Sequence, residues 1–177
     1  MSLLRDVVAV LEGAEIRHAL IGAVAMAVHG VSRSTADIDL LTVETRSLRE
    51  ELWADLKARG ASLRILKGDF EDPLAGSVRL REGTQVVDVV VGRYVWQKEI
   101  LAAAEQQSIG EIELPVARPA GLVLLKLDAG GPKDAWDIRS LLEVHAPAEA
   151  IRAEVDRVIP RLSAESRHLW ERLRAGG

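Results

Sequence analysis

The sequence predicts an α+β protein in which a mixed β-sheet with packed helices is followed by a small C-terminal helical bundle. Residues up to about 116 alternate between strand-like and helix-like periods, whereas everything after Pro119 has helical period without strand signals. A chain of 177 residues with 48% hydrophobic and 28% charged residues is typical of an ordinary globular protein with a sizeable core.

The first part of the chain alternates helices and strands. Residues 2–13 carry an apolar stripe at helical spacing, and the short turn Glu82-Gly83-Thr84 separates two strand-like runs as a hairpin would. We expect strands at 16–21, 37–43, 62–66, 77–82, 85–91 and 110–116, and helices at 2–13, 23–30, 46–59 and 93–106. This part is predicted to form a core domain, residues 1–116.

The second part is predicted to be a helical region, residues 117–177. Gly130-Gly131-Pro132 interrupts its helical pattern, and Pro160 suits the first turn of a helix. The expected helices are 119–129, 133–144, 148–158 and 160–174.

Composition excludes several classes of protein. The chain contains no cysteine, so disulfide scaffolds and thiolate metal sites are excluded, and a reducing compartment such as the cytoplasm is expected. No apolar run reaches the length of a membrane span, so no membrane partner is expected. The net charge of −4 argues against a protein coated with phosphate contacts.

The segment Asp37-Ile38-Asp39 places two carboxylates on one face of an otherwise apolar strand. Two adjacent like charges there are costly unless they are solvated, share a proton or neutralise a cation. Oxygen ligands of this kind favour Mg²⁺, although a pair of exposed acids at a strand end is the simpler alternative.

A third carboxylate, Asp88, interrupts the apolar strand at 85–91. If this strand neighbours the one at 37–43, the three acids form a cluster able to hold two Mg²⁺ ions. Gly22 ends a strand just before a helix, where backbone N–H groups could meet a phosphate, and the Arg33-Ser34 pair precedes the acidic strand, where it could contact phosphate oxygens.

Gly22-Ala23, the spaced Asp37-x-Asp39 and the later Asp88 together resemble the signature of the DNA polymerase β-like nucleotidyltransferase superfamily, across roughly residues 16–91. The run from residue 33 to 40 resembles the minimal nucleotidyltransferases, including abortive-infection toxins of the AbiEii type. Ala23 departs from the pattern, because the superfamily usually has a second Gly or Ser there.

A second segment, residues 122–142, resembles the helical motif of the same toxins through Lys126, Lys133, Asp134 and Asp137. The resemblance implies catalytic roles for Lys126 and Asp134 and a substrate contact for Lys133. An ammonium in the apolar helix around Lys126 needs a counter-charge, which a triphosphate would supply, whereas Asp134 could equally be a first-turn acid stabilised by its helix dipole.

The resemblance as a whole implies a nucleotidyltransferase fold and Mg²⁺-dependent transfer of a nucleoside monophosphate from a nucleoside triphosphate to an acceptor hydroxyl. Residues 151–177 hold six arginines against four acidic residues, which favours RNA or tRNA as the acceptor. The alternatives are a small antibiotic of the aminoglycoside or lincosamide type, and a non-catalytic toxin-antitoxin module; a cognate antitoxin is a possible partner.

Overall fold

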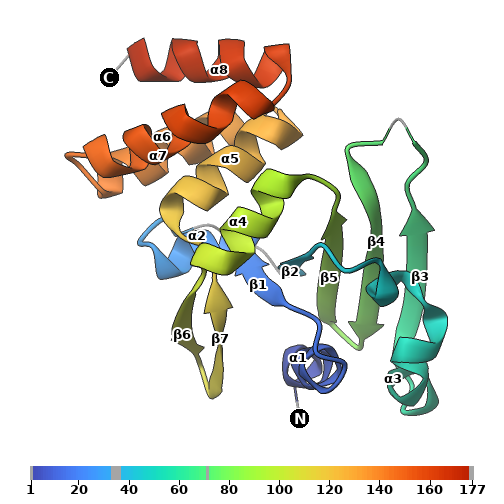
Figure 1. Ribbon diagram of the computed structural model, residues 1–177. Coiled ribbons are helices and arrows are strands. Elements are labelled where there is room, and N and C mark those ends of the chain that lie inside the picture. Colours follow the sequence, from blue (N-terminus) through green and yellow to red (C-terminus); the bar gives the residue numbers. More distant parts are fainter. Residues whose placement is uncertain (1, 33–36, 71, 176–177) are drawn as a thin grey trace. The chain divides into compact units, whose positions relative to one another are not determined.

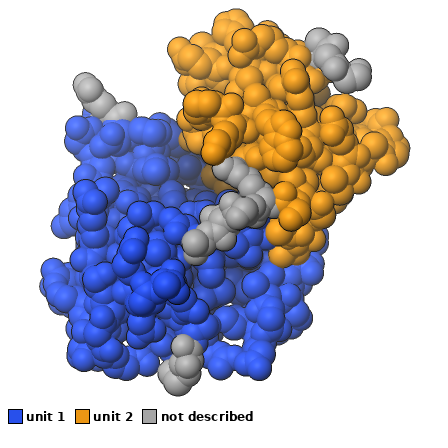
Figure 2. Space-filling model, turned by 180° about the vertical axis from the view of Figure 1, so that it is seen from behind, with its two compact units in different colours: residues 1–24, 34–117 blue, residues 25–33, 118–177 orange. Residues whose placement is uncertain are grey.

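The structure is a computed structural model that describes residues 2–32, 37–70 and 72–175 of the chain. The chain divides into two units, drawn in different colours in Figure 2: unit 1 comprises residues 1–24 and 34–117, and unit 2 comprises residues 25–33 and 118–177. The segment 25–33 therefore groups with the C-terminal helices, although it lies within the range 1–116 in the sequence.

Unit 1 is built on a mixed sheet (Figure 1). Among the described residues, seven strands lie in the order β3-β4-β5-β2-β1-β7-β6. β2 pairs in parallel with β5, and β1 in parallel with β7, whereas the other neighbours are antiparallel. The strands are β1 (His18–Ile21), β2 (Asp37–Thr42), β3 (Ser62–Lys67), β4 (Leu74–Glu82), β5 (Gln85–Gly92), β6 (Glu105–Ile109) and β7 (Ile112–Val116). This arrangement confirms the α+β prediction.

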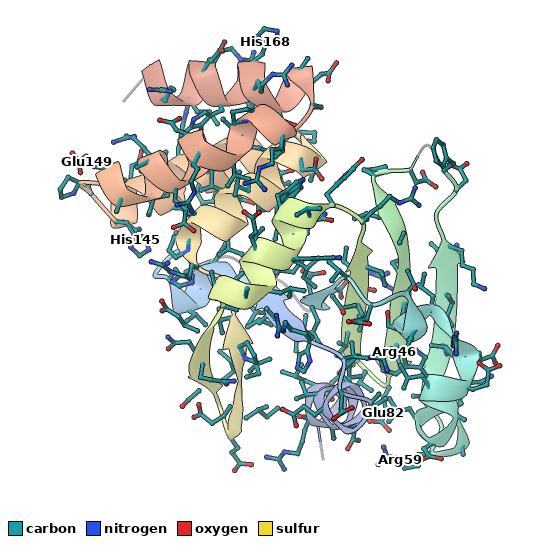
Figure 3. The ribbon with its side chains drawn as sticks, in the orientation of Figure 1. Arg46, Arg59, Glu82, His145, Glu149 and His168 are labelled. Carbon is teal, nitrogen blue, oxygen red and sulfur yellow. The ribbon has the colours of Figure 1, made fainter. Side chains whose placement is uncertain are left out.

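The apolar alternation of the strands buries one face of the sheet. Leu40 of β2, Leu80 of β4 and Val89 of β5 are fully buried. Helix α1 (Leu3–Gly13) packs its apolar stripe near β5, and the Leu3 N–H donates a hydrogen bond to Gln85 Oε1. Its N-terminus is capped by the Ser2 hydroxyl, which accepts from the Arg5 N–H. Glu82, labelled in Figure 3, marks the β4–β5 hairpin that the sequence predicts.

The predicted helix at 46–59 is wrong, because the chain forms two 3₁₀ turns, Thr45–Leu48 and Glu50–Trp53, before the short helix α3 (Ala54–Ala58). The Ser47 hydroxyl donates to the Glu44 carbonyl, and Trp53 Nε1 donates to the Ser47 carbonyl at 2.8 Å. These bonds between side chain and backbone compete with a continuous helix.

The predicted helix at 93–106 and single strand at 110–116 are also wrong in part. Helix α4 (Val95–Ala103) ends earlier, and the following residues form the β6–β7 hairpin instead of continuing the helix. Two smaller differences are that α2 (Gly22–Val28) stops before Gly30, and that β4 begins at Leu74 rather than at residue 77.

Unit 2 contains α5 (Pro119–Ala129), α6 (Asp134–Val144), α7 (Glu149–Val158) and α8 (Ala164–Ala175), with a 3₁₀ turn at Ile159–Arg161 where the sequence predicted the start of a helix at 160. α5 contacts α6, α7 and α8, and Val123, Ile138, Val155 and Trp170 are buried among them. No helix in the described ranges is both long and apolar enough to span a membrane.

Candidate active site

The predicted acids meet on neighbouring strands of unit 1. β2 and β5 pair in parallel, and Asp39 is the register partner of Asp88. Asp37 lies two residues before Asp39 and so projects from the same face of the sheet. The strand adjacency that the sequence analysis required is therefore present, and we refer to Asp37, Asp39 and Asp88 as the acid cluster.

The register continues across β4 and β3, so that one row of side chains crosses four strands. Asp88 faces Arg79 on β4, and Arg79 faces Arg64 on β3. Register partners project from the same face. The acid cluster is thus continued toward the β3 edge of the sheet by two arginines.

Arg79 binds the acid cluster directly. Its Nε donates to Asp88 Oδ1 at 2.8 Å, and its Nη2 donates to Asp88 Oδ2 at 2.6 Å and to Asp37 Oδ2 at 3.0 Å. The hydrogen bonds to Asp88 and the charges of Asp88, Asp37 and Asp39 hold the pKa of the Arg79 guanidinium above its ordinary value. Arg79 is therefore a permanent cation that is bound to the acid cluster.

Gly22 is the point where the backbone approaches Asp39. It follows β1 directly and begins α2 with a φ of +67°, a conformation that favours glycine. A Cβ at position 22 would lie 2.1 Å from Asp39 Oδ2. The predicted glycine turn thus leaves room for a carboxylate of the acid cluster.

The donor set fits a magnesium site in its chemistry. It offers carboxylate oxygens from two adjacent strands, and two of the three acids already share one cation, Arg79. Within the described ranges, no group of three or more His, Cys, Asp or Glu side chains is arranged to hold a metal ion. In the arrangement seen here, Asp37 and Asp88 point to the guanidinium.

A cavity of about 330 Å³ opens on the same face of the sheet. Two acids, Asp39 and Asp88, and two arginines, Arg64 and Arg79, contribute to its lining. Leu66, Ser77 and Val90 complete the lining. The arginines of the lining could therefore bind an anionic group, and the acids could accept a hydrogen bond from a hydroxyl group.

Lys126 meets Asp134 and Asp137 in unit 2. Lys126 Nζ lies 2.8 Å from Asp134 Oδ1 and 2.5 Å from Asp137 Oδ2. The three side chains are 15%, 12% and 0% exposed, respectively. Asp134 Oδ2 also accepts from the Gly131 N–H at 2.7 Å. The counter-charge of Lys126 thus comes from two carboxylates of α6, and the prediction that a triphosphate supplies it is not needed to explain the buried ammonium.

The remaining predicted residues have less defined surroundings. Ala23 is buried in the first turn of α2, and Lys133 is exposed at the start of α6. Arg33 and Ser34, predicted to contact substrate, lie outside the described residues.

Sequence reasoning missed Arg79 and Arg64. The alternation Ser77-Val78-Arg79-Leu80-Arg81 placed Arg79 on the polar face of its strand, which was an available signal. The register that brings it opposite Asp88 is set by the β4–β5 hairpin and could not be read from that alternation alone.

Comparisons with known proteins agree with this fold. The structure resembles the antibiotic-resistance factor ANT(2'')-Ia with a TM-score of 0.59, at 15% identity and over 90% of each chain. It also resembles the lincosamide antibiotic adenylyltransferase LnuA in its lincomycin-bound form, with a TM-score of 0.51 and 15% identity over 80% of this chain and 95% of that one. These likenesses establish a nucleotidyltransferase-like fold. A search of curated proteins by sequence finds no match.

A family model described as "Nucleotidyl transferase of unknown function (DUF2204)" matches residues 1–174, almost the whole chain. The match covers both the acid cluster of unit 1 and the Lys126 group of unit 2. The protein is therefore an enzyme that belongs to this family of nucleotidyl transferases.

Proposed function

We propose that the protein transfers a nucleoside monophosphate from a nucleoside triphosphate to an acceptor hydroxyl, in a reaction that depends on Mg²⁺, with the acid cluster as its centre. The observation that carries this proposal is the register pairing of Asp39 with Asp88 on parallel neighbouring strands, with Asp37 on the same face. Three carboxylates on two strands offer oxygen ligands from separate directions, which suits one or two Mg²⁺ ions.

In the proposed reaction, the acceptor oxygen forms a bond to the α-phosphorus, and the bond from that phosphorus to the pyrophosphate oxygen breaks. Bound Mg²⁺ would neutralise charge on the triphosphate and on the acceptor oxygen. Asp37 and Asp39 would ligate the metal, while Asp88 would ligate a second ion or accept the proton from the acceptor hydroxyl. Positioning and charge neutralisation supply most of the acceleration in such a site.

Gly22 and Ala23 would bind the donor, because Gly22 allows the backbone to come close to the acid cluster. Arg33 and Ser34 are proposed to contact donor phosphates from the segment just before β2. Lys126, Asp134 and Lys133 keep the roles that the motif implies, two catalytic and one substrate-binding, as proposals. The ion pairs of Lys126 mean that any contact with a triphosphate would have to compete with two carboxylates.

RNA is the acceptor that the charge distribution supports best. Arg64, Arg79 and Arg81 lie on the same face of the sheet as the acid cluster, because Arg64 and Arg79 are register partners and Arg81 follows Arg79 by two residues. In unit 2, Arg157, Arg161 and Arg172 are exposed. Arginines on these surfaces would attract a phosphate backbone, and they would offset the attraction of the acid cluster for a polycationic drug.

A small antibiotic is the second candidate acceptor. The fold is shared with ANT(2'')-Ia, whose structure has been described with adenylyl-2''-tobramycin, at 16% identity and a TM-score of 0.59 over 90% of this chain and 96% of that one, and with LnuA. A lincosamide carries less positive charge than an aminoglycoside, so it would be repelled less by the arginines of unit 1.

A toxin of the abortive-infection type, controlled by a cognate antitoxin, is the biological setting that we propose for an RNA acceptor. A modification that blocks the 3′ ends of functional RNA would be harmful to a cell and would require such control. Expression of the wild type and of the Asp39→Asn variant in a bacterial host tests this setting: growth arrest by the wild type alone supports it, and equal growth contradicts it.

The acceptor is tested by incubating the protein with Mg²⁺ and each nucleoside triphosphate labelled at the α-phosphate. Total RNA, the protein itself and a panel of aminoglycosides and lincosamides are offered in separate reactions. Label in the RNA pool, reduced by added salt, is the expected result, because phosphate contacts weaken as salt rises. Label in the drug pool alone would contradict an RNA acceptor while retaining nucleotidyl transfer.

A further inference from the structure

Arg79 has a place in the candidate active site that no sequence motif assigns to it. Its guanidinium holds both oxygens of Asp88 and one oxygen of Asp37. One cation therefore bridges carboxylates from two strands, which is the relation that a divalent metal at this cluster would also require.

We propose that Arg79 is a tethered counter-ion of the acid cluster, which a metal ion must displace from Asp88 and Asp37 before it can bind there. The inference rests on the proposed function, because it takes the acid cluster as the metal site. It adds a residue that opposes metal binding in the substrate-free enzyme and is itself no metal ligand.

Occupation of Asp88 on both oxygens is the first reason. Nε and Nη2 of Arg79 approach Oδ1 and Oδ2 at 2.8 and 2.6 Å, so a fork of two parallel bonds covers the carboxylate. Asp88 is also the less exposed of the two partners, at 15% against 42% for Asp37. A metal that takes a lone pair now used by Arg79 must break that bond, and a metal that takes another lone pair of Asp88 must bind close to the positive charge of the guanidinium.

The freedom of Arg79 to leave is the second reason. Its side chain is 47% exposed, and it rises from β4 on a long flexible stem. Ion pairs with this degree of exposure contribute little stability, because water screens them and the side chains lose entropy in forming them. A divalent ion with two positive charges can therefore replace the guanidinium at moderate cost.

The charge balance is the third reason. The acid cluster has three carboxylates, and Arg79 neutralises one of those charges. Without a cation the acids repel one another on adjacent strands. Arg79 thus stabilises the metal-free site, and once displaced it remains in the lining of the cavity beside Asp39, where its charge can meet an anionic substrate.

Arg64 provides a matched control on the same face. It is the register partner of Arg79 and lines the same cavity, but β4 separates its strand from β5, so it stands one strand farther from Asp88. Changing Arg64 to glutamine removes the same charge from the same surface. A difference in Mn²⁺ affinity between the two variants therefore reports the direct contact of Arg79 with the acids. It cannot come from the loss of one positive charge on this surface, because both variants lose that charge.

The test is calorimetric titration of Mn²⁺ into the metal-free full chain, without nucleotide, for the wild type, Arg79→Gln, Arg79→Lys and Arg64→Gln. Circular dichroism and a melt in chelator confirm that each variant is folded. We expect Arg79→Gln to bind Mn²⁺ about fivefold more tightly or better, because the ion-paired state in which Arg79 occupies Asp88 and Asp37 no longer competes with the metal. We expect Arg64→Gln to stay within about twofold of the wild type, because its charge is screened, and Arg79→Lys to lie between them.

A second readout is the rise in melting temperature that Mn²⁺ produces, which should be larger in Arg79→Gln than in the wild type. Unchanged or weaker Mn²⁺ binding by Arg79→Gln, with binding by the wild type intact, overturns the inference and leaves the proposed function standing. An equal gain in Arg79→Gln and Arg64→Gln overturns it in the same way. Absence of Mn²⁺ binding in every variant contradicts the metal centre of the proposed function itself.

Discussion

Asp39 packs its carboxylate against the α-carbon of Gly22, so closely that a Cβ at position 22 would lie 2.1 Å from Asp39 Oδ2. The turn after β1 and the acidic strand β2 are therefore in direct contact at this point. β1 and β2 are antiparallel neighbours in which Ile21 is the register partner of Asp39, so the residue after Ile21 comes close to the carboxylate. This contact links the glycine turn to the position of an acid that the proposed reaction requires.

Gly22→Ala is expected to reduce both stability and activity. The added methyl must displace the Asp39 side chain, and an alanine at a φ of +67° is strained by about 1 kcal/mol. Gly83→Ala is the control, because Gly83 has a φ of +56° and, among the described residues, no heavy atom beyond its two chain neighbours lies within 4 Å of the place that its added methyl group would take. Melting and nucleotidyl-transfer assays should show a similar strain in both variants but lost activity only in Gly22→Ala. Full activity of Gly22→Ala would contradict the link to Asp39.

Asp37→Asn and Asp39→Asn should leave the apo fold intact. Each removes one of three neighbouring negative charges, which relieves repulsion, and the ion pair of Asp37 with Arg79 is exposed. The melting temperature in chelator should change by about 2 °C or less. A sharp fall in the melting temperature of either variant would assign these carboxylates a structural role instead.

Lys126→Met is expected to destabilise unit 2. From the sequence alone, replacing a partly buried ammonium with an apolar chain would have been harmless, but the structure pairs Lys126 with Asp134 and with the fully buried Asp137. Removing the cation leaves these buried carboxylates without their counter-charge, which should lower the free energy of unfolding by about 3 kcal/mol. Urea unfolding measures the loss.

Lys133→Met is the matched control for this variant, because Lys133 is exposed seven residues farther along the chain. It should unfold at nearly the wild-type urea concentration. Equal stability of Lys126→Met and Lys133→Met would show that the Lys126 ion pairs contribute nothing to folding.

Asp128→Asn should raise stability at neutral pH. Burial raises the pKa of the Asp128 carboxyl in the folded protein above its ordinary value. The folded state then binds the proton more tightly than the unfolded state, so stability falls as the pH rises from the ordinary aspartate pKa, about 4, through the folded value. The advantage of the asparagine variant in thermal melts should therefore shrink as the pH approaches about 4. An advantage independent of pH would contradict the burial effect.

The sequence predicted the acid cluster because strand alternation is a local property. Asp37 and Asp39 had to share a face, and the apolar run around Asp88 marked a buried strand. Alternation does not determine the register between strands, so the pairing of Arg79 with Asp88 is known only from the structure. The pairing of Lys126 with Asp137 depends on how two helices pack, which the sequence pattern also does not determine.

The β6–β7 hairpin shows a second limit. β6 reads Glu105-Gln106-Gln107-Ser108-Ile109, which lacks the apolar alternation of a strand because β6 lies at the edge of the sheet and keeps polar side chains in water. The helix predicted for residues 93–106 therefore ends at Ala103 in the structure.

The most direct test of the central claim compares Mg²⁺-dependent transfer of α-labelled nucleotide by the wild type, Asp39→Asn, Asp88→Asn and Asp55→Asn. Asp55 is an exposed aspartate of α3 in the same unit, so it undergoes the same chemical change outside the acid cluster. The account predicts transfer by the wild type and Asp55→Asn that chelator abolishes, and a loss of about 100-fold or more in the other two. Transfer that survives in Asp39→Asn and Asp88→Asn would contradict the assignment of the acid cluster as the catalytic centre.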